Sequence, residues 1–133
     1  MAIDYGRVRI GIATCDELGI STRPLGFIPR ENDIKAAAIV AELARRERAQ
    51  ALVIGLPLHA NGDAGGNVRW VRDFLKELAK VCTLTVHEVD ERYSSSEAEE
   101  ALKEEGKWPP TSKGQVDAKA AAILLRRYLN GED

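Results

Sequence analysis

The chain has 133 residues, the size of one domain, and hydrophobic residues make up 44% of it, enough for an ordinary packed core. Nineteen basic residues face 21 acidic ones for a formal net charge of −2, which excludes both a polybasic nucleic-acid coat protein and an acidic disordered tail. Apolar runs are far shorter than the ~18 residues of a membrane span and no leader pattern is visible, so we expect a cytoplasmic protein without membrane association.

The first part of the chain predicts three strands. Residues 1–5 form a short strand that breaks at Gly6, and residues 9–15 alternate as the second arm of a hairpin. Residues 22–28 predict a third strand, and Pro24 places it at or near a sheet edge because proline cannot donate to a strand ladder. The chain therefore opens as a meander.

The rest of the chain alternates helices with strands. From residue 33 the apolar spacing becomes that of an amphipathic helix, and the continuous apolar run 51–55 then fits a strand covered on both faces. Strands separated by helices pair in parallel through right-handed crossovers, so we expect a mixed α/β sheet of five strands in the order βββαβαβαα. The other predicted elements are a helix around 68–78, a strand at 84–89, a helix from Ser94 or Ser96 to about Gly106, and a helix from Lys113 or Gln115 to Leu129.

Acidic residues occur where two predicted parallel strands end and where the last helix begins: Asp4, Asp90 and Glu91, and Asp117. Each has an ordinary explanation on its own, namely a backbone turn bond, a surface ion pair or a favourable helix dipole. The carboxyl ends of parallel strands, however, form the usual ligand crevice of such a sheet, so we expect these acids to converge.

Converging carboxylates are the ligands that Mg²⁺ and Mn²⁺ prefer, whereas the two cysteines lack the spacing of a zinc site. A pair of such ions can activate water and stabilise the leaving oxygen of a phosphodiester without a His or Cys nucleophile. The sequence therefore predicts phosphodiester hydrolysis with Mg²⁺ or Mn²⁺ as cofactor.

Four blocks spread over the chain resemble the YqgF (RuvX) family. They are Ile3-Asp4-Tyr5-Gly6-Arg7 with Ile10-Gly11-Ile12-Ala13, then Val53-Ile54-Gly55-Leu56-Pro57-Leu58, then Asp90-Glu91-Arg92-Tyr93-Ser94, and Val116-Asp117-Ala118-Lys119-Ala120-Ala121. Their order and spacing make the match far more specific than any single block. The resemblance implies an RNase H-like fold with helices on both faces of the sheet, one nuclease domain over residues 1–133, and activity on pre-16S rRNA or on Holliday junctions.

The resemblance also implies roles for individual residues. Asp4, Glu91 and Asp117 correspond to metal-binding catalytic carboxylates, with Asp90 as an additional metal neighbour, and Arg92 to a phosphate contact. The loop 55–66 resembles a substrate-facing loop, although His59-Ala60-Asn61 departs from the usual run there. Only three residues precede Asp4, fewer than the family usually has, so we expect that side of the site to be loosely anchored. The substrate-binding candidates are Arg7, His59, Asn61, Arg92 and Lys113.

Basic residues near the predicted site contrast with an acidic helix. Lys107, Lys113 and Lys119 precede and enter the last helix, whereas residues 97–105 carry five glutamates against one lysine and are expected to face away from phosphate. Trp108 could stack on an unpaired base, but core packing or a dimer contact is the more common role for such a residue.

Four functions are compatible with these observations. The first is a divalent-metal-dependent nuclease on structured nucleic acid that processes the 5′ end of pre-16S rRNA. The second is a Holliday junction resolvase, which a stable homodimer would favour because two strands must be cut. The third is a non-catalytic RNA-binding module of ribosome assembly. The fourth is an ATPase of the actin and sugar-kinase type, because residues 3–6 also resemble the first phosphate loop of those proteins, but that fold needs two such domains.

Overall fold

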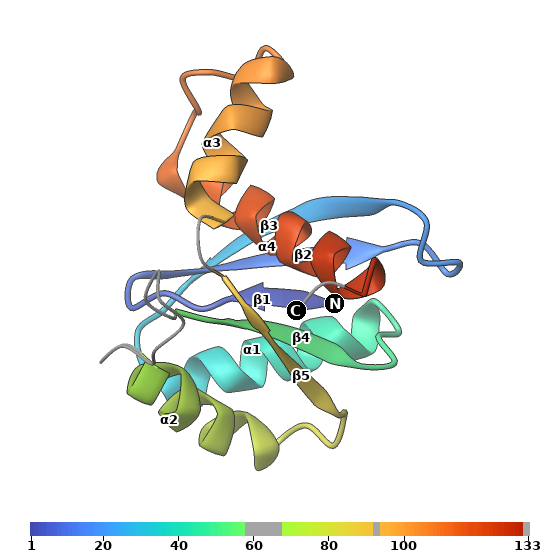
Figure 1. Cartoon of the computed structure of the whole chain (residues 1–133). Helices are drawn as coiled ribbons and strands as arrows, with labels where there is room; N and C mark the ends of the chain where they lie inside the picture. Colours follow the sequence, from blue (N-terminus) through green and yellow to red (C-terminus); the bar gives the residue numbers. More distant parts are fainter. Residues whose placement is uncertain (58–67, 92–93, 132–133) are drawn as a thin grey trace.

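The computed structural model describes residues 1–57, 68–91 and 94–131. A five-stranded sheet in the order β3-β2-β1-β4-β5 lies between helices (Figure 1). The strands are β1 (Ala2–Asp4), β2 (Arg9–Cys15), β3 (Thr22–Pro29), β4 (Leu52–Leu56) and β5 (Val86–Asp90), and the helices are α1 (Asp33–Arg46), α2 (Val68–Ala79), α3 (Ser94–Glu104) and α4 (Lys113–Leu129). The predicted order βββαβαβαα is confirmed.

The sheet is mixed, as the sequence predicted. β2 pairs antiparallel with β1 and β3, whereas β4 pairs parallel with β1 and β5. β3 lies at the edge that Pro24 indicated. The last strand begins at Val86, two residues later than expected, and includes Asp90. The carboxyl ends of β1, β4 and β5 consequently point to the same end of the sheet (Figure 1).

β1 is the central strand, so the expectation of a loosely anchored first strand is wrong. Ile3 is fully buried and Met1 is 6% exposed, because β2 and β4 flank the strand on both sides. The amino group of Met1 donates a hydrogen bond of 3.2 Å to the carbonyl oxygen of Ala51. Pairing on both edges fixes Asp4 in position.

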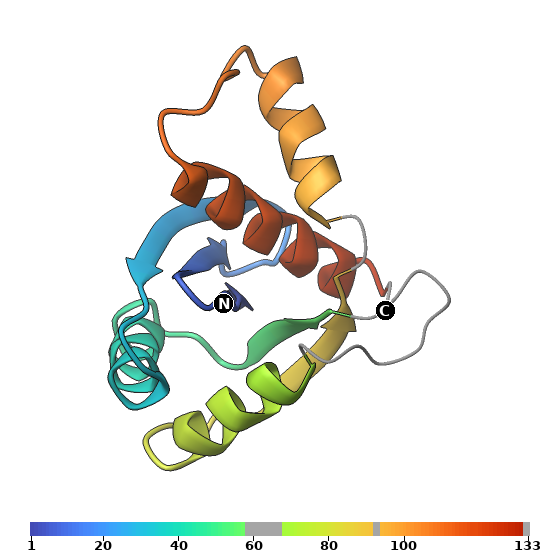
Figure 2. The ribbon, with the colours of Figure 1, turned by 90° about the vertical axis from the view of Figure 1, so that its left-hand side faces the viewer.

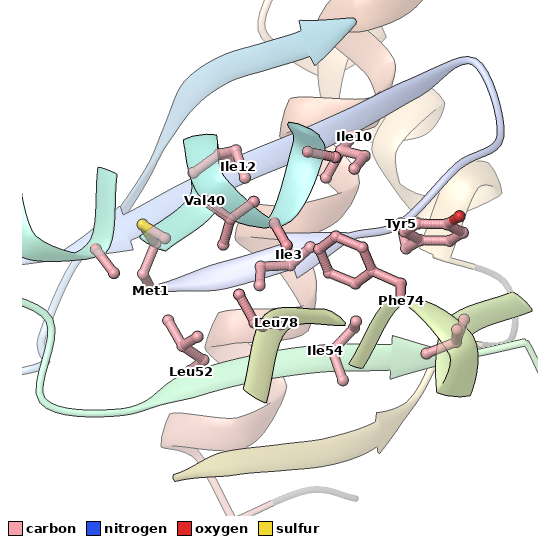
Figure 3. Packing of buried hydrophobic residues seen from close by; sticks show 14 residues of the cluster. Met1, Ile3, Tyr5, Ile10, Ile12, Val40, Leu52, Ile54, Phe74 and Leu78 are labelled. Atoms are coloured by element: carbon pink, nitrogen blue, oxygen red, sulfur yellow. The ribbon is translucent and has the colours of Figure 1, made fainter. Parts of the chain in front are cut away.

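Helices cover both faces of the sheet (Figure 2). α1 and α2 cover one face, where Ile3, Ile54 and Phe74 pack in the larger core cluster (Figure 3). α4 covers the other face and meets Ala2 and Val53 in a second cluster. α3 packs on α4 and projects away from the sheet (Figure 1). No helix within the described residues is both long and apolar enough to cross a lipid bilayer.

Candidate active site

Strand alternation turns the acidic residues of β1 and β5 toward α4. On β1, Ala2 belongs to the cluster under α4, so Asp4, two residues later, faces the same way. On β5, Val89 belongs to that cluster, so Glu91 follows it toward α4. The backbone N–H of Glu91 donates 3.1 Å to the carbonyl oxygen of Leu56, which holds Glu91 at the end of β4.

Two glycines let the acids approach one another. Gly11 is the cross-strand partner of Asp4, and a Cβ atom on Gly11 would lie 2.2 Å from the carbonyl oxygen of Asp117. α4 therefore rests directly on the β2 backbone beside Asp4. On β4, a Cβ on Gly55 would lie 2.6 Å from Oε2 of Glu91. Both glycines provide space that any side chain would fill.

Asp4 and Glu91 form a hydrogen-bonded pair of carboxyl groups. Burial raises the pKa of Asp4 well above its ordinary value, and the charges of Glu91 and Asp117 raise it further. Burial also raises the pKa of Glu91, while its hydrogen bond with Asp4 opposes that rise. Two acids that repel each other in a partly buried site would both ionise more easily beside a cation.

Asp117 is close enough to affect Asp4 but is paired with a cation of the protein itself. Nε of Arg9 donates a 2.8 Å hydrogen bond to Oδ2 of Asp117, and these two side chains are 30% and 27% exposed. Arg9 lies on β2 two residues before Gly11 and so faces α4 as well. Arg9 therefore holds the third acid in place through a charge-assisted bond.

The donor set fits a hard divalent cation. Oε2 of Glu91 is buried and has no hydrogen-bond partner among the described residues. Ionised carboxylate oxygens are ligands of Mg²⁺ and Mn²⁺, and Asp4 and Glu91 supply them side by side. Within residues 1–57, 68–91 and 94–131, no group of three His, Cys, Asp or Glu side chains already has the arrangement of a metal site. Asp4 and Glu91 already lie side by side, whereas Asp117 is bonded to Arg9 next to them.

The other predicted site residues divide into three groups. Asp90 precedes Glu91 and by alternation faces the α1–α2 side, so the structure does not bring it into the pair, although its charge raises the pKa of Glu91. Arg7 is exposed, with its guanidinium 4.8 Å from the ring centroid of Trp70, and Lys113 is exposed at the start of α4. Arg92, His59 and Asn61 lie outside the described residues.

Two glutamates of the acidic segment 97–105 form ion pairs with basic residues of α4. Glu105, just after α3, pairs with Lys119 at 2.5 Å and with Lys107 at 3.6 Å. Glu97 pairs with Arg127 at 2.5 Å. The negative charge of α3 is thus partly neutralised by α4, on which the helix packs. Trp108 is 43% exposed and lies beneath Lys103 instead of packing in the core.

Two residues of this site were missed as functional candidates from the sequence: Gly11 and Gly55. The signal for the glycines was their position inside strands, where glycine often marks a close backbone approach.

Comparison with known proteins identifies the family of the chain. A family model described as "RuvX: Holliday junction resolvase" matches residues 1–131. The chain belongs to the RuvX family. The resemblance of the four sequence blocks is thereby confirmed, and the acids of the site lie inside the matched region.

Relatives whose names refer to an rRNA nuclease match this RuvX chain over nearly all of its length. A protein of Synechococcus elongatus is 39% identical over 130 residues, covering 98% of the chain and 87% of the relative. A protein of Anaeromyxobacter sp. strain Fw109-5 is 39% identical over 132 residues, covering 98% and 96%. Both are named "Putative pre-16S rRNA nuclease".

The fold of this RuvX protein is also that of RuvC. The solved structure described as Thermus thermophilus RuvC in complex with Holliday junction substrate superposes with a TM-score of 0.60, at 18% identity, over 97% of this chain and 91% of the RuvC chain. At that identity the likeness establishes the fold, and the expected RNase H-like fold is confirmed.

Proposed function

We propose that this RuvX protein is a divalent-metal-dependent nuclease that hydrolyses phosphodiester bonds in structured nucleic acid, with the precursor of 16S rRNA as its substrate. The observation that carries the proposal is the half-buried pair Asp4 and Glu91 with Asp117 beside it. Membership of a family described as a resolvase, and relatives named as rRNA nucleases, support the reaction type.

Each residue then has a defined task. Asp4 and Glu91 would hold the cation, and Asp117 would join them when Arg9 releases it. A bound Mg²⁺ or Mn²⁺ supplies a Lewis acid that polarises the phosphate and lowers the pKa of water. Arg9 places positive charge beside Asp117, and the exposed Arg7 and Lys113 would provide further contacts for phosphate oxygens of the substrate.

A cleavage assay with Mn²⁺ titration tests the proposal. A pre-16S rRNA fragment and a four-way DNA junction are incubated in parallel with the wild type, with Asp4→Asn and with Asp73→Asn. Asp73 is an exposed acid on α2 and serves as the matched control. We expect Asp4→Asn to lose at least about a hundredfold in rate, as is usual for loss of one catalytic group. Asp73→Asn should retain full activity.

The second candidate function is a Holliday junction resolvase. It is supported by the family description and by the shared fold of RuvC, whose solved complex contains a Holliday junction. Cleavage of the junction but not of the rRNA fragment would favour it. Undiminished turnover by Asp4→Asn would contradict both nuclease functions, and absence of any Mn²⁺ effect on the melting midpoint would favour a non-catalytic RNA-binding module.

A further inference from the structure

Within the described residues, Arg9 is the one basic side chain bonded to an acid of the candidate site. It begins β2, and its Nε donates 2.8 Å to Oδ2 of Asp117. Because β2 runs antiparallel to β1 with Gly11 opposite Asp4, Arg9 lies two residues farther toward the end of the sheet where the acids meet. The ion pair therefore lies on the same side and at the same end of the sheet as Asp4.

The guanidinium of Arg9 is only partly used. Its bond to Asp117 engages Nε, and no other residue in the described part of the chain bonds to either of its terminal nitrogens. Each of those nitrogens carries N–H donors that suit oxygen ligands. The Arg9 and Asp117 side chains are 30% and 27% exposed, so a ligand from solution can reach the pair.

The same bond limits what Asp117 can do. Its charge acts on Asp4, so the two carboxyl groups are near one another. A carboxylate that is neutralised by a guanidinium attracts a cation less strongly than a free one does. Arg9 therefore weakens the contribution of Asp117 to any cation that Asp4 and Glu91 hold.

A phosphodiester is the ligand that could separate this pair. Its oxygens match the fork of a guanidinium and carry the negative charge that would replace that of Asp117. Partly exposed ion pairs are weakly held, so a phosphate delivered by a bound nucleic acid can compete with the carboxylate. The displaced carboxylate would then regain its full charge beside the other acids.

We propose that Arg9 exchanges partners when nucleic acid binds. Its guanidinium leaves Asp117 for a phosphate of the substrate, and Asp117 is released to join Asp4 and Glu91 in holding the cation. The inference rests on the proposed nuclease function, to which it adds a coupling between two ligands. By linkage, nucleic acid and cation each tighten the binding of the other.

Nitrogen NMR of the Arg9 side chain in EDTA tests the exchange without metal or cleavage. The Nε–H resonance of Arg9 is identified by its absence from Arg9→Met. The probes are an oligothymidylate of about 10 nucleotides and an uncharged methylphosphonate oligomer of the same sequence. The first should shift the resonance and the second should leave it in place. A resonance that the oligothymidylate does not move would overturn the exchange.

Affinity for the same oligothymidylate in EDTA tests the competition. Asp117→Asn frees Arg9, so it should tighten binding about two- to fivefold, the scale of an exposed ion pair. The matched control is Glu91→Gln, which removes a carboxylate from the same site and leaves Arg9 paired. In an Arg9→Met background, Asp117→Asn should gain no more than Glu91→Gln does. An equal gain from Asp117→Asn with and without Arg9 would overturn the exchange.

Release of Asp117 toward a cation is measured by titrating Mg²⁺ without nucleic acid. Arg9→Met leaves Asp117 permanently free and should bind Mg²⁺ about two- to fivefold more tightly. Arg7→Met removes the same charge two positions away but breaks no bond to a site acid, so its effect should be smaller. Equal effects of the two substitutions would overturn the release of Asp117.

The phosphate contact has its own measurement. Arg9→Met should reduce the slope of oligothymidylate affinity against salt by about one unit, and an unaltered slope would overturn the contact. A wild type that shifts the Arg9 resonance but cleaves neither nucleic acid would overturn only the nuclease function. Cleavage that is lost in Asp4→Asn, together with an unmoved Arg9 resonance in the wild type, would overturn only the exchange, so the two failures are distinguishable.

Discussion

Asp4 lies on the central strand β1, close to the carboxyl groups of Glu91 at the carboxyl end of β5 and of Asp117 on α4. In the metal-free protein this arrangement raises the pKa of Asp4, so the folded chain binds a proton more tightly than the unfolded chain does. A cation would remove the repulsion and reverse the effect. The stability of the protein should therefore respond to pH and to metal through this one residue.

The first prediction concerns thermal stability without metal. Below about pH 4 an aspartate is protonated in both states, and as the pH rises the unfolded chain releases its proton first. Wild-type stability should therefore fall from about pH 4 until the pH passes the raised pKa of Asp4. Asp4→Asn removes this loss, so at pH 8 in EDTA its melting midpoint should exceed that of the wild type by a few degrees, on the order of the shift for 1 kcal/mol.

Added Mn²⁺ supplies the control for that prediction. It should raise the wild-type midpoint more at pH 8 than at pH 5, because protons compete for the same oxygens, and it should barely change Asp4→Asn. Melting curves at both pH values measure this. Parallel pH profiles for the two proteins would contradict a raised pKa of the carboxyl at position 4.

Arg9 gives the second residue-scale prediction. Because its guanidinium neutralises Asp117 beside the acid pair, Arg9→Met should leave the site more negative and bind Mn²⁺ several-fold more tightly. The ion pair is partly exposed, so stability without metal should change by less than about 1 kcal/mol. Calorimetric titration with Mn²⁺ measures the affinity. Arg72→Met is the control, since Arg72 pairs with Glu88 at 2.9 Å on the surface.

At the scale of elements, the site depends on how closely α4 approaches the sheet. Small residues of α4, among them Ala118, Ala121 and Ala122, face the sheet, and Gly11 lies directly under Asp117. Without this contact the third acid would stand farther from Asp4. The helix that covers the core is thus also the helix that completes the site.

The third prediction tests this contact. Gly11→Ala places a methyl group against backbone atoms that cannot rotate away, so it should destabilise the fold by about 2 kcal/mol or more. Ala13→Gly, on the same face of β2, removes a methyl group and should have a smaller effect of about 1 kcal/mol. Urea denaturation measures both. A Gly11→Ala protein as stable as the wild type would show that α4 does not rest on β2.

On the scale of the whole molecule, the layers differ in how firmly they are attached. The sheet, α1, α2 and α4 share buried clusters, whereas α3 packs on α4 through Ala98 and Leu102 and projects outward (Figure 1). Its charged contacts with α4 are exposed on the glutamate side and contribute little. α3 should therefore unfold locally while the sheet, α1, α2 and α4 stay folded.

The fourth prediction follows from this attachment. Leu102→Ala removes a buried side chain from the α3–α4 contact, which typically weakens packing by about 2–5 kcal/mol. Amide hydrogen exchange should speed up at least about tenfold in α3 and remain unchanged in β4. Leu78→Ala in the main core is the comparison and should accelerate exchange throughout. Equal acceleration everywhere in Leu102→Ala would mean that α3 is part of one cooperative unit.

How much of this arrangement the sequence could predict depended on the range of the interaction. Periodicity gave the order of elements, and Pro24 identified the edge strand, because both signals are local. Parallel pairing alone was enough to predict that the acids lie at one end of the sheet. The Arg9–Asp117 bond joins residues 108 positions apart, and the turn of Glu105 toward α4 depends on tertiary packing, so neither had a local signal.

The outer edge of β3 has a consequence for self-association. Pro24 and Pro29 both lie in this strand, where their missing N–H groups are tolerated only if they would point away from β2. The unpaired rim of the sheet therefore lacks donors at two positions, and another chain cannot extend the ladder there without leaving its own carbonyls unsatisfied. The β3 edge is therefore protected from edge-to-edge pairing with another chain.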